Sequence, residues 1–405
     1  MAELAITRQR RRDTSESEFS LRSKYSFSAE NSVKCRNSLC SKPPQSMSEP
    51  SMTEHELVSR LVDALRELPD VQADAERRER SGGLDAAVDL HVAGKSLAVL
   101  VEARKAVYPR DVRQVIWQIR DASRAWAGSH EGEAVSLIAA ESISPGAKEL
   151  LRTEGVGYYD SGGSLYLPAP GIYLYIDKPP PKTLVKSIRS LFSGRRAQVL
   201  HALLFHRQAW FGVTELSQLS QVSPATASQV LTELERFDWL ASRGQGPNKE
   251  RSLGEPAALL DAWVGQVKID RPPVLRRYYV PATKSDALPM RVAEALEGRG
   301  VEYAISHEAA AQKLAPFLSS VSQLRLRLLP GQAAEAALGE LGARMVTEGT
   351  NLAIIETKSA GELLFRERLE ELWLASPIQI YLDLLRGEGR SKEMAEHFRK
   401  ERIGF

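Results

Sequence analysis

The sequence predicts an α+β protein of several domains, and three observations lead to this prediction. The chain has 405 residues, which at roughly 150 residues per domain suggests two or three domains. The apolar fraction is 43% and the charged fraction 26%, values at which ordinary globular cores form. Helical and strand periodicities alternate along the chain after about residue 50.

Charge and cysteine content exclude several classes of protein. There are 54 basic and 52 acidic residues, giving a formal net charge of +2, so any nucleic-acid surface must be local. The two cysteines, Cys35 and Cys40, exclude a disulfide scaffold and a cysteine-based zinc module. The seven histidines show no zinc-hydrolase spacing, so we expect neither a metal nor a cofactor. No apolar run approaches about eighteen residues, which predicts a cytoplasmic protein without a membrane partner.

Residues 1–50 are predicted to be a disordered tail. An arginine-rich stretch at 8–12 is followed by a serine-rich region with few aliphatic side chains, a composition that cannot bury enough surface to fold. For this arginine cluster, we favour a solvated tail over a contact with a phosphate backbone. Met47 and Met52 are alternative translation starts between which the sequence does not decide.

Residues 51–178, the first segment, are predicted to form a mixed α/β domain. Thr53 and Glu56 have the spacing of a helix-capping box, and apolar residues then recur at helical spacing. Gly94 separates two apolar runs that predict a hairpin, the second run being apolar enough for burial on both faces. The expected elements are a helix over 57–68, strands over 84–92 and 97–103, a helix over 110–126, a strand over 135–140, a helix over 145–154 and short strands between 158 and 176.

Two acids lie in this hairpin: Asp89 on one strand and Glu102 on the next, followed by Arg104 and Lys105. This pattern resembles the PD-(D/E)xK nuclease fold, the restriction-endonuclease-like α/β fold. The resemblance implies two metal-holding carboxylates and a lysine two residues after the second. Strand alternation instead places Arg104 on the face of Glu102, and a guanidinium cannot act as a base. We therefore expect a degenerate site, with no catalytic residue, in which Asp89, Glu102 and Arg104 form an internal ion-pair network. Lys105 would restore the site only through a bulge.

Residues 183–268, the helix-rich segment, predict a helix-turn-helix. A helix over 194–206 precedes an apolar-periodic segment at 213–219, a turn at 220–223 and a helix over 224–236. Ser223 is a favourable N-cap and Pro224 suits the first helical position. The outer face of this last helix carries short, uncharged side chains that suit a helix lying in the major groove of DNA. The candidate DNA-binding residues here are Ser223, Thr226, Ser228, Gln229 and Thr232, with Gln229 expected to contact adenine.

A basic hairpin is expected to follow this helix. A strand over 239–243 leads to a tip at 244–251, and Ser252 and Leu253 return. Arg243, Lys249 and Arg251 on such a tip would neutralise phosphates or enter a minor groove. Arg195 and Arg196 add positive charge upstream. Together these features predict a winged helix-turn-helix DNA-binding domain; the alternative is the same fold used for protein contacts.

Residues 275–405, the C-terminal segment, mix strands and helices. Strands are expected over 323–329 and 352–356, and a helix over 377–386. The alternation around Arg325 and Arg327 predicts that both arginines are exposed on one sheet face, where a solvated face is favoured over a DNA surface. Asp383 lies on an apolar helix and is expected to be structural.

Several stretches over 90–405 form an ordered pattern. They are Val101–Lys105, Pro145 with Leu150-Leu151, Gly155–Asp160, Gly171-Ile172-Tyr173, Leu191-Phe192-Ser193 leading into the helix-turn-helix, Ser376–Leu385, Gly389-Arg390 and Ala395-Glu396. Taken in this order they resemble AbiEi-type antitoxins, the transcriptional regulators of type IV toxin–antitoxin systems. The resemblance implies promoter binding through the winged helix and an inactive nucleotidyltransferase-like C-terminal domain. The long tail and the nuclease-like segment depart from the simplest members of that family.

The sequence therefore predicts a sequence-specific DNA-binding transcriptional regulator, an autorepressor or antitoxin-like protein that is not an enzyme. Its expected partner is double-stranded operator or promoter DNA, which places it with the nucleoid in the cytoplasm. A cognate toxin encoded nearby and a homodimer are further expectations. The alternatives are a metal-dependent DNA endonuclease targeted by its winged helix and a protein-interaction adaptor.

Overall fold

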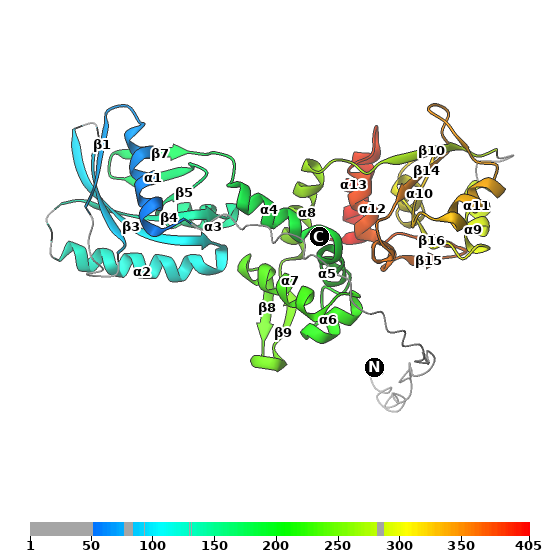
Figure 1. The fold of residues 1–405 in the computed structure, drawn as a ribbon, viewed down its shortest axis with the longest axis horizontal. Coiled ribbons are helices and arrows are strands. Elements are labelled where there is room, and N and C mark those ends of the chain that lie inside the picture. Colours follow the sequence, from blue (N-terminus) through cyan, green and yellow to red (C-terminus); the bar gives the residue numbers. More distant parts are fainter. Residues whose placement is uncertain (1–51, 77–83, 93, 129, 131, 282–286) are drawn as a thin grey trace, which may run out of the picture. The chain divides into compact units, whose positions relative to one another are not determined.

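The computed structural model describes residues 52–76, 84–92, 94–128, 130, 132–281 and 287–405 (Figure 1). The expected tail over 1–50 lies outside these residues. The rest is a mixed α+β structure, as expected from the alternating periodicities. Within the described residues, no helix is both long enough and apolar enough to span a bilayer.

The first segment is built around one sheet whose seven strands neighbour one another in chain order. Strands β3–β4 and β4–β5 pair in parallel, and every other neighbouring pair is antiparallel. Its elements are α1 (Glu54–Arg66), β1 (Val71–Glu76), β2 (Ala86–Val92), β3 (Lys95–Val107), α2 (Pro109–Ala127), β4 (Ala134–Ile143), α3 (Pro145–Thr153), β5 (Gly157–Asp160), β6 (Leu165–Ala169) and β7 (Ile172–Ile176).

Helices cover both faces of this sheet. In β4, Leu137 and Ala139 join the apolar cluster that contains the buried face of α1, whereas Ile138 and Ala140 join the cluster under α2 and α3. Burial on both faces explains why β3 and β4 are nearly continuous apolar runs. The capping box of Thr53 and Glu56 at the start of α1 is confirmed. Strand β1 was not predicted, because its sequence carries too few apolar residues to show a period.

The helix-rich segment contains a compact group of three helices followed by a hairpin. Its elements are α4 (Lys182–Leu191), α5 (Gly194–Phe205), α6 (Val213–Leu219), α7 (Pro224–Arg236), β8 (Leu240–Arg243), a 3₁₀ turn (Gly246–Asn248), β9 (Glu250–Leu253) and α8 (Pro256–Ile269). Leu216 of α6 and Leu231 of α7 are fully buried, and both lie in one apolar core with Leu200 of α5. Figure 1 shows β8 and β9 extending away from these helices.

The C-terminal segment carries a second seven-stranded sheet, in the order β13-β10-β14-β12-β11-β16-β15. Its elements are β10 (Leu275–Tyr279), α9 (Leu288–Glu297), β11 (Tyr303–Ser306), α10 (His307–Leu314), β12 (Leu324–Leu328), α11 (Gln332–Glu340), β13 (Arg344–Met345), β14 (Leu352–Glu356), β15 (Glu367–Leu369), β16 (Leu372–Leu374), α12 (Pro377–Leu384) and α13 (Ser391–Phe398). One apolar core includes residues of both the helix-rich and the C-terminal segments, such as Leu200 and Phe398.

The expected exposure of Arg325 and Arg327 on β12 is wrong. Arg327 is buried, and its Nη2 lies 2.6 Å from Oδ1 of the buried Asp383 on α12. Arg325 is half-buried, with Nη1 3.6 Å from Oε2 of Glu308. Helices α10 and α12 cover this face of the sheet and supply the carboxylates, which strand alternation alone cannot reveal. Asp383 has the structural role expected of it.

Candidate nucleic-acid interface

Helix α7 is held firmly against the neighbouring helices by one apolar face. Val230, Leu231 and Leu234 are fully buried and pack in the core that also contains α5 and α6. The Ser223 hydroxyl accepts a hydrogen bond of 3.2 Å from the backbone amide of Thr226, which confirms the predicted N-cap. A side chain on the outer face of α7 is therefore presented from a rigid support.

The outer face of α7 carries the polar residues that the sequence indicated. Gln229 and Thr232 are exposed, whereas Thr226 and Ser228 are half-buried. The Thr232 hydroxyl donates to the backbone oxygen of Ser228 at 2.9 Å, and the hydroxyls of Ser223 and Thr226 lie 2.9 Å apart. These hydroxyls are bonded within the helix and keep further lone pairs for an outside partner.

Gln229 is the residue of this face with a contact to another helix. Its side-chain oxygen accepts a hydrogen bond of 3.3 Å from Arg196 on α5, and Arg196 also donates to the Ser190 hydroxyl at 3.1 Å. The neighbouring Arg195 is exposed. The structure thus brings Arg196 to the outer face of α7, a contact across 33 residues that the sequence did not indicate.

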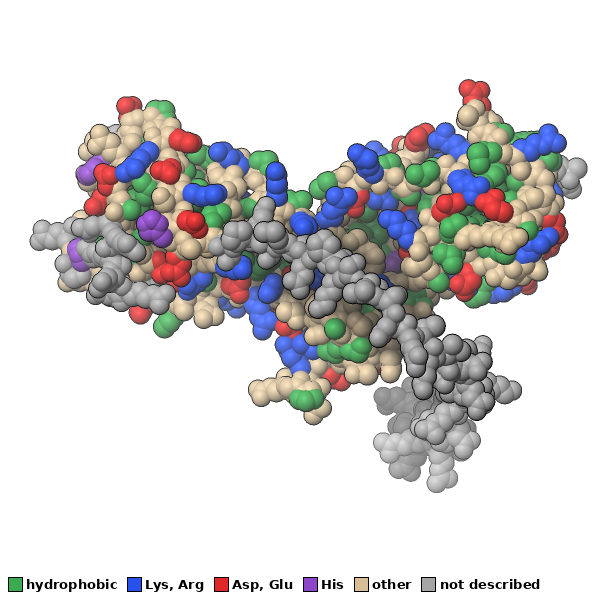
Figure 2. Space-filling model, in the orientation of Figure 1, with side chains coloured by type: hydrophobic (Ala, Val, Ile, Leu, Met, Phe, Trp, Pro, Cys, Tyr) green, Lys and Arg blue, Asp and Glu red, His purple; other side chains and the backbone are tan. Residues whose placement is uncertain are grey.

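The hairpin differs from its expected arrangement. Its tip, residues 244–248, contains no basic residue, and Arg243 lies at the end of β8. The Arg243 guanidinium stacks over the Trp210 ring at 4.4 Å and its Nε donates to Glu250 Oε2 at 2.6 Å. Figure 2 shows Lys and Arg side chains at the base of the hairpin, whose tip bears other types. The basic charge therefore lies close to α7.

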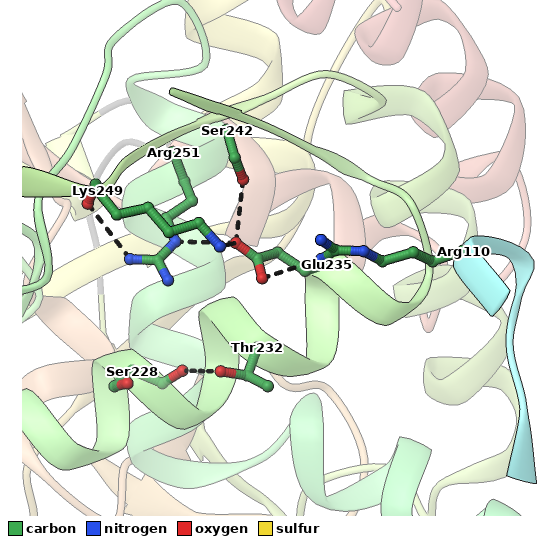
Figure 3. A network of polar contacts seen from close by, with 7 residues as sticks. All are labelled: Arg110, Ser228, Thr232, Glu235, Ser242, Lys249 and Arg251. Carbon is green, nitrogen blue, oxygen red and sulfur yellow. Dashed lines mark hydrogen bonds and ion pairs between the residues drawn. The ribbon is translucent and has the colours of Figure 1, made fainter. Parts of the chain in front are cut away.

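Arg251 does not sit on a tip, contrary to expectation. It is 9% exposed on β9, and its backbone bonds to Phe211 in both directions. Its Nε donates to Oε1 of Glu235 on α7 at 3.0 Å, and Lys249 Nζ lies 2.6 Å from the same oxygen (Figure 3). Glu235, which the sequence did not single out, anchors the hairpin to α7. A glutamate on the otherwise apolar side of the predicted helix was the available signal.

The electrostatics of Glu235 reflect these partners. Burial acts to raise its pKa. Hydrogen bonds from Lys249, Arg251 and Ser242 outweigh that effect and bring the pKa to about 2, so the carboxylate stays charged at neutral pH. Figure 3 also shows Arg110 of α2, whose Nη1 lies 3.1 Å from Oε2 of Glu235. Lys249 and Arg251 thus serve the hairpin's attachment rather than offering free charge.

The nuclease-like residues of the first segment do not gather as expected. Asp89 is exposed and pairs with Ala98 in the register of β2 and β3, four residues along the strand from Glu102. That register places Asp85 opposite Glu102, and the Asp85 carboxylate accepts from the amide of Ala103 at 2.7 Å. The sequence did not single out Asp85, because its place near Glu102 follows from the strand register.

Arg104 is the immediate partner of Glu102. Their charged groups approach to 2.5 Å, and Arg104 also donates to Gln118 of α2 at 2.8 Å. Lys105 is exposed. Burial raises the pKa of Glu102, the Arg104 guanidinium lowers it, and Asp85 raises it, with a net upward shift. Within the described residues, no group of three or more His, Cys, Asp or Glu side chains is arranged to hold a metal ion.

Comparisons with models of protein families, with curated proteins and with solved structures found no match to this chain.

Proposed function

We propose that this protein is a sequence-specific, double-stranded-DNA-binding regulator that recognises its site through α7. One observation carries the proposal: Thr226, Gln229 and Thr232 present uncharged hydrogen-bonding groups on the outer face of a helix whose other face is fully anchored. A helix with such a face fits the major groove, because bulky or acidic side chains there would meet base edges or phosphates.

The three helices α5, α6 and α7 followed by the β8–β9 hairpin support a winged helix-turn-helix arrangement. In this arrangement the Gln229 side chain pairs with an adenine edge, its amide oxygen accepting from N6 and its amide nitrogen donating to N7. Arg196 holds the side-chain oxygen of Gln229 and is positioned to exchange that bond for one to DNA. Arg195 and Arg243 supply phosphate contacts, and therefore salt-dependent affinity.

The wider role rests on the resemblance to AbiEi-type regulators. We propose repression of the protein's own promoter, and a toxin encoded nearby as the second partner. The nuclease-like residues are assigned no reaction. Glu102 already has the guanidinium of Arg104 at 2.5 Å, so these residues do not fit the carboxylate pair that a metal-dependent nuclease would need.

Binding to the DNA upstream of the protein's own gene tests this proposal. We expect fluorescence anisotropy to give an affinity for that duplex that exceeds the affinity for a scrambled duplex, with log Kd rising linearly with log salt. The double variant Gln229→Ala/Thr232→Ala should lose the preference. Gln332→Ala, an exposed glutamine at the start of α11, is the matched control and should retain it.

Three outcomes would contradict the proposal. Equal affinity of the unmodified protein for both duplexes is one, and loss of preference in the control alone is another. Cleavage of plasmid DNA that depends on magnesium or manganese and disappears in Glu102→Ala would instead establish the endonuclease.

A further inference from the structure

A cavity in the C-terminal segment is lined by three arginines that come from different parts of the fold. Its volume is about 390 Å³. Arg277 comes from β10, Arg325 from β12 and Arg386 from the residues that follow α12, and all three line this cavity. The turn over 347–350 completes the wall and contributes two threonines.

Among the described residues, one ion pair, between Arg325 and Glu308, joins the three guanidiniums to a carboxylate. Arg277 is exposed and forms no ion pair within the described part of the chain. Arg325 has Glu308 at 3.6 Å, beyond hydrogen-bond distance, and donates instead to the uncharged Gln323 at 2.6 Å. Two acids, Glu348 and Glu388, also line the cavity, and no ion pair joins either of them to these arginines among the described residues.

Among the three arginines, Arg386 is the one with a buried donor that lacks a hydrogen-bond acceptor among the described residues. Its Nε is buried and has no hydrogen-bond partner among the described residues. Burial lowers its pKa, and the nearby Asp383 opposes that effect. Asp383 is already occupied, because it accepts hydrogen bonds from Ser306 and Gln379 and a bidentate pair from Arg327. A buried guanidinium nitrogen without an acceptor costs free energy that an incoming anion would recover.

We propose that this cavity binds the phosphate group of a small molecule. Arginine offers planar pairs of N–H donors that match phosphate oxygens, and three guanidiniums in one cavity suit a group that carries more than one negative charge, as a phosphate does. The hydroxyls of Thr347 and Thr350 add uncharged donors at the same wall. The volume falls within the range of about 300 to 1,000 Å³ that small-ligand sites occupy, so the bound molecule is up to nucleotide size.

Calorimetric titration of the full chain at constant ionic strength tests this site. The probes are inorganic phosphate, pyrophosphate and a nucleoside triphosphate, with chloride as the reference anion. We expect saturable binding of at least one probe with a dissociation constant below about 1 mM. The probe that binds most tightly then shows whether the site takes a free phosphate or a nucleotide.

Two glutamine substitutions show where the probe binds. Arg277→Gln removes an exposed guanidinium without disturbing the core, and we expect it to weaken binding at least about tenfold. Arg344→Gln changes an exposed arginine on the adjacent β13 that does not line the cavity, and binding should be unchanged. Arg386→Lys, which keeps the charge but loses the buried Nε, should weaken binding as well.

The proposal is overturned if no probe binds above the chloride reference. It is also overturned if Arg277→Gln binds as well as the unmodified protein, or if Arg344→Gln weakens binding equally. If phosphates fail to bind but Arg277→Gln weakens duplex DNA binding, the arginines contact a DNA backbone and the small-molecule site is wrong. The outcomes measured with phosphate probes do not depend on whether α7 recognises DNA.

Discussion

Arg251 on β9 donates a hydrogen bond of 3.0 Å from Nε to Oε1 of Glu235, close to the C-terminal end of α7. Both residues are buried, and Lys249 and Ser242 share the same carboxylate oxygen. The hairpin is therefore fastened to the proposed recognition helix by charge as well as by packing. This relationship sets the position of Arg243 relative to Gln229.

Removing the Glu235 carboxylate should destabilise the protein. In Glu235→Ala, Lys249 and Arg251 lose their common acceptor, and we expect the free energy of unfolding to fall by about 3 kcal/mol. Urea unfolding followed by tryptophan fluorescence measures this change. Glu250→Ala removes an exposed partner of Arg243 and should cost less than about 1 kcal/mol. Equal losses in the two variants would show that the buried carboxylate has no special role.

Lowering the pH should reduce the free energy of unfolding through protonation of His201. Burial and the charge of Arg327 lower its pKa to about 4, against 6.5 for an ordinary histidine, and its Nε2 lies 2.5 Å from the Ser376 hydroxyl. Between pH 6.5 and 4 the histidine is protonated in the unfolded chain but not in the folded protein. The contribution of His201 to the free energy of unfolding is therefore complete above pH 6.5 and falls as the pH drops from 6.5 towards 4.

The histidine effect is measured as the slope of unfolding free energy against pH. His201→Gln should reduce the slope between pH 4 and 6.5 by about 1.4 kcal/mol per pH unit, the value for one proton. His55→Gln, at an exposed position on α1, serves as the control and should keep the slope. An unchanged slope in His201→Gln would refute the assignment.

Gln229 should determine sequence preference. We expect Gln229→Ala to lower affinity for the cognate duplex about tenfold while scarcely changing affinity for a scrambled one, because a bidentate base contact contributes about 1–3 kcal/mol of discrimination. Arg196→Ala, which frees the side-chain oxygen of Gln229, should alter the preference to a smaller extent. Competition anisotropy measures both ratios. An equal loss on both duplexes in Gln229→Ala would remove the residue from base recognition.

Arg243 should contribute affinity without preference. It lies exposed at the end of β8, stacked on Trp210. Arg243→Ala should weaken every duplex alike and reduce the salt slope by about one, as expected for one lost phosphate contact. Arg299→Ala, an exposed arginine after α9 that pairs with Glu340, is the matched control. A change in the ratio of cognate to scrambled affinity in Arg243→Ala would be evidence against a pure phosphate contact.

The buried pair of Arg327 and Asp383 should behave differently when it is broken than when it is replaced. Asp383→Asn leaves the buried guanidinium without its counter-charge and should cost about 3–5 kcal/mol. The double variant Arg327→Met/Asp383→Leu removes both charges and should be more stable than Asp383→Asn. Thermal unfolding measures both. A double variant less stable than Asp383→Asn would show that the unpaired buried guanidinium is not the main cost of the single substitution.

Local signals in the sequence were sufficient for much of the secondary structure. Ser223 and Thr53 cap their helices because a side-chain oxygen needs only an amide three residues away. Strands β3 and β4 were predictable from their apolar runs, although β3 extends to Val107, four residues beyond the predicted end. Strand β1 and the pairing of Asp85 with Glu102 depend on register, which only contacts between strands establish.

What the sequence determined by itself was the set of short-range features: the helix starts, the buried strands and the uncharged outer face of α7. These depend on spacings of a few residues, over which side-chain chemistry and backbone geometry act directly. Tertiary structure decided which basic side chains are held by buried carboxylates. Arg251 and Arg327 are basic residues on strands, like Arg243, but each has a buried carboxylate supplied by a helix from another part of the chain. The pattern of the strand that carries each arginine does not contain that partner, which lies 16 residues away for Arg251 and 56 residues away for Arg327.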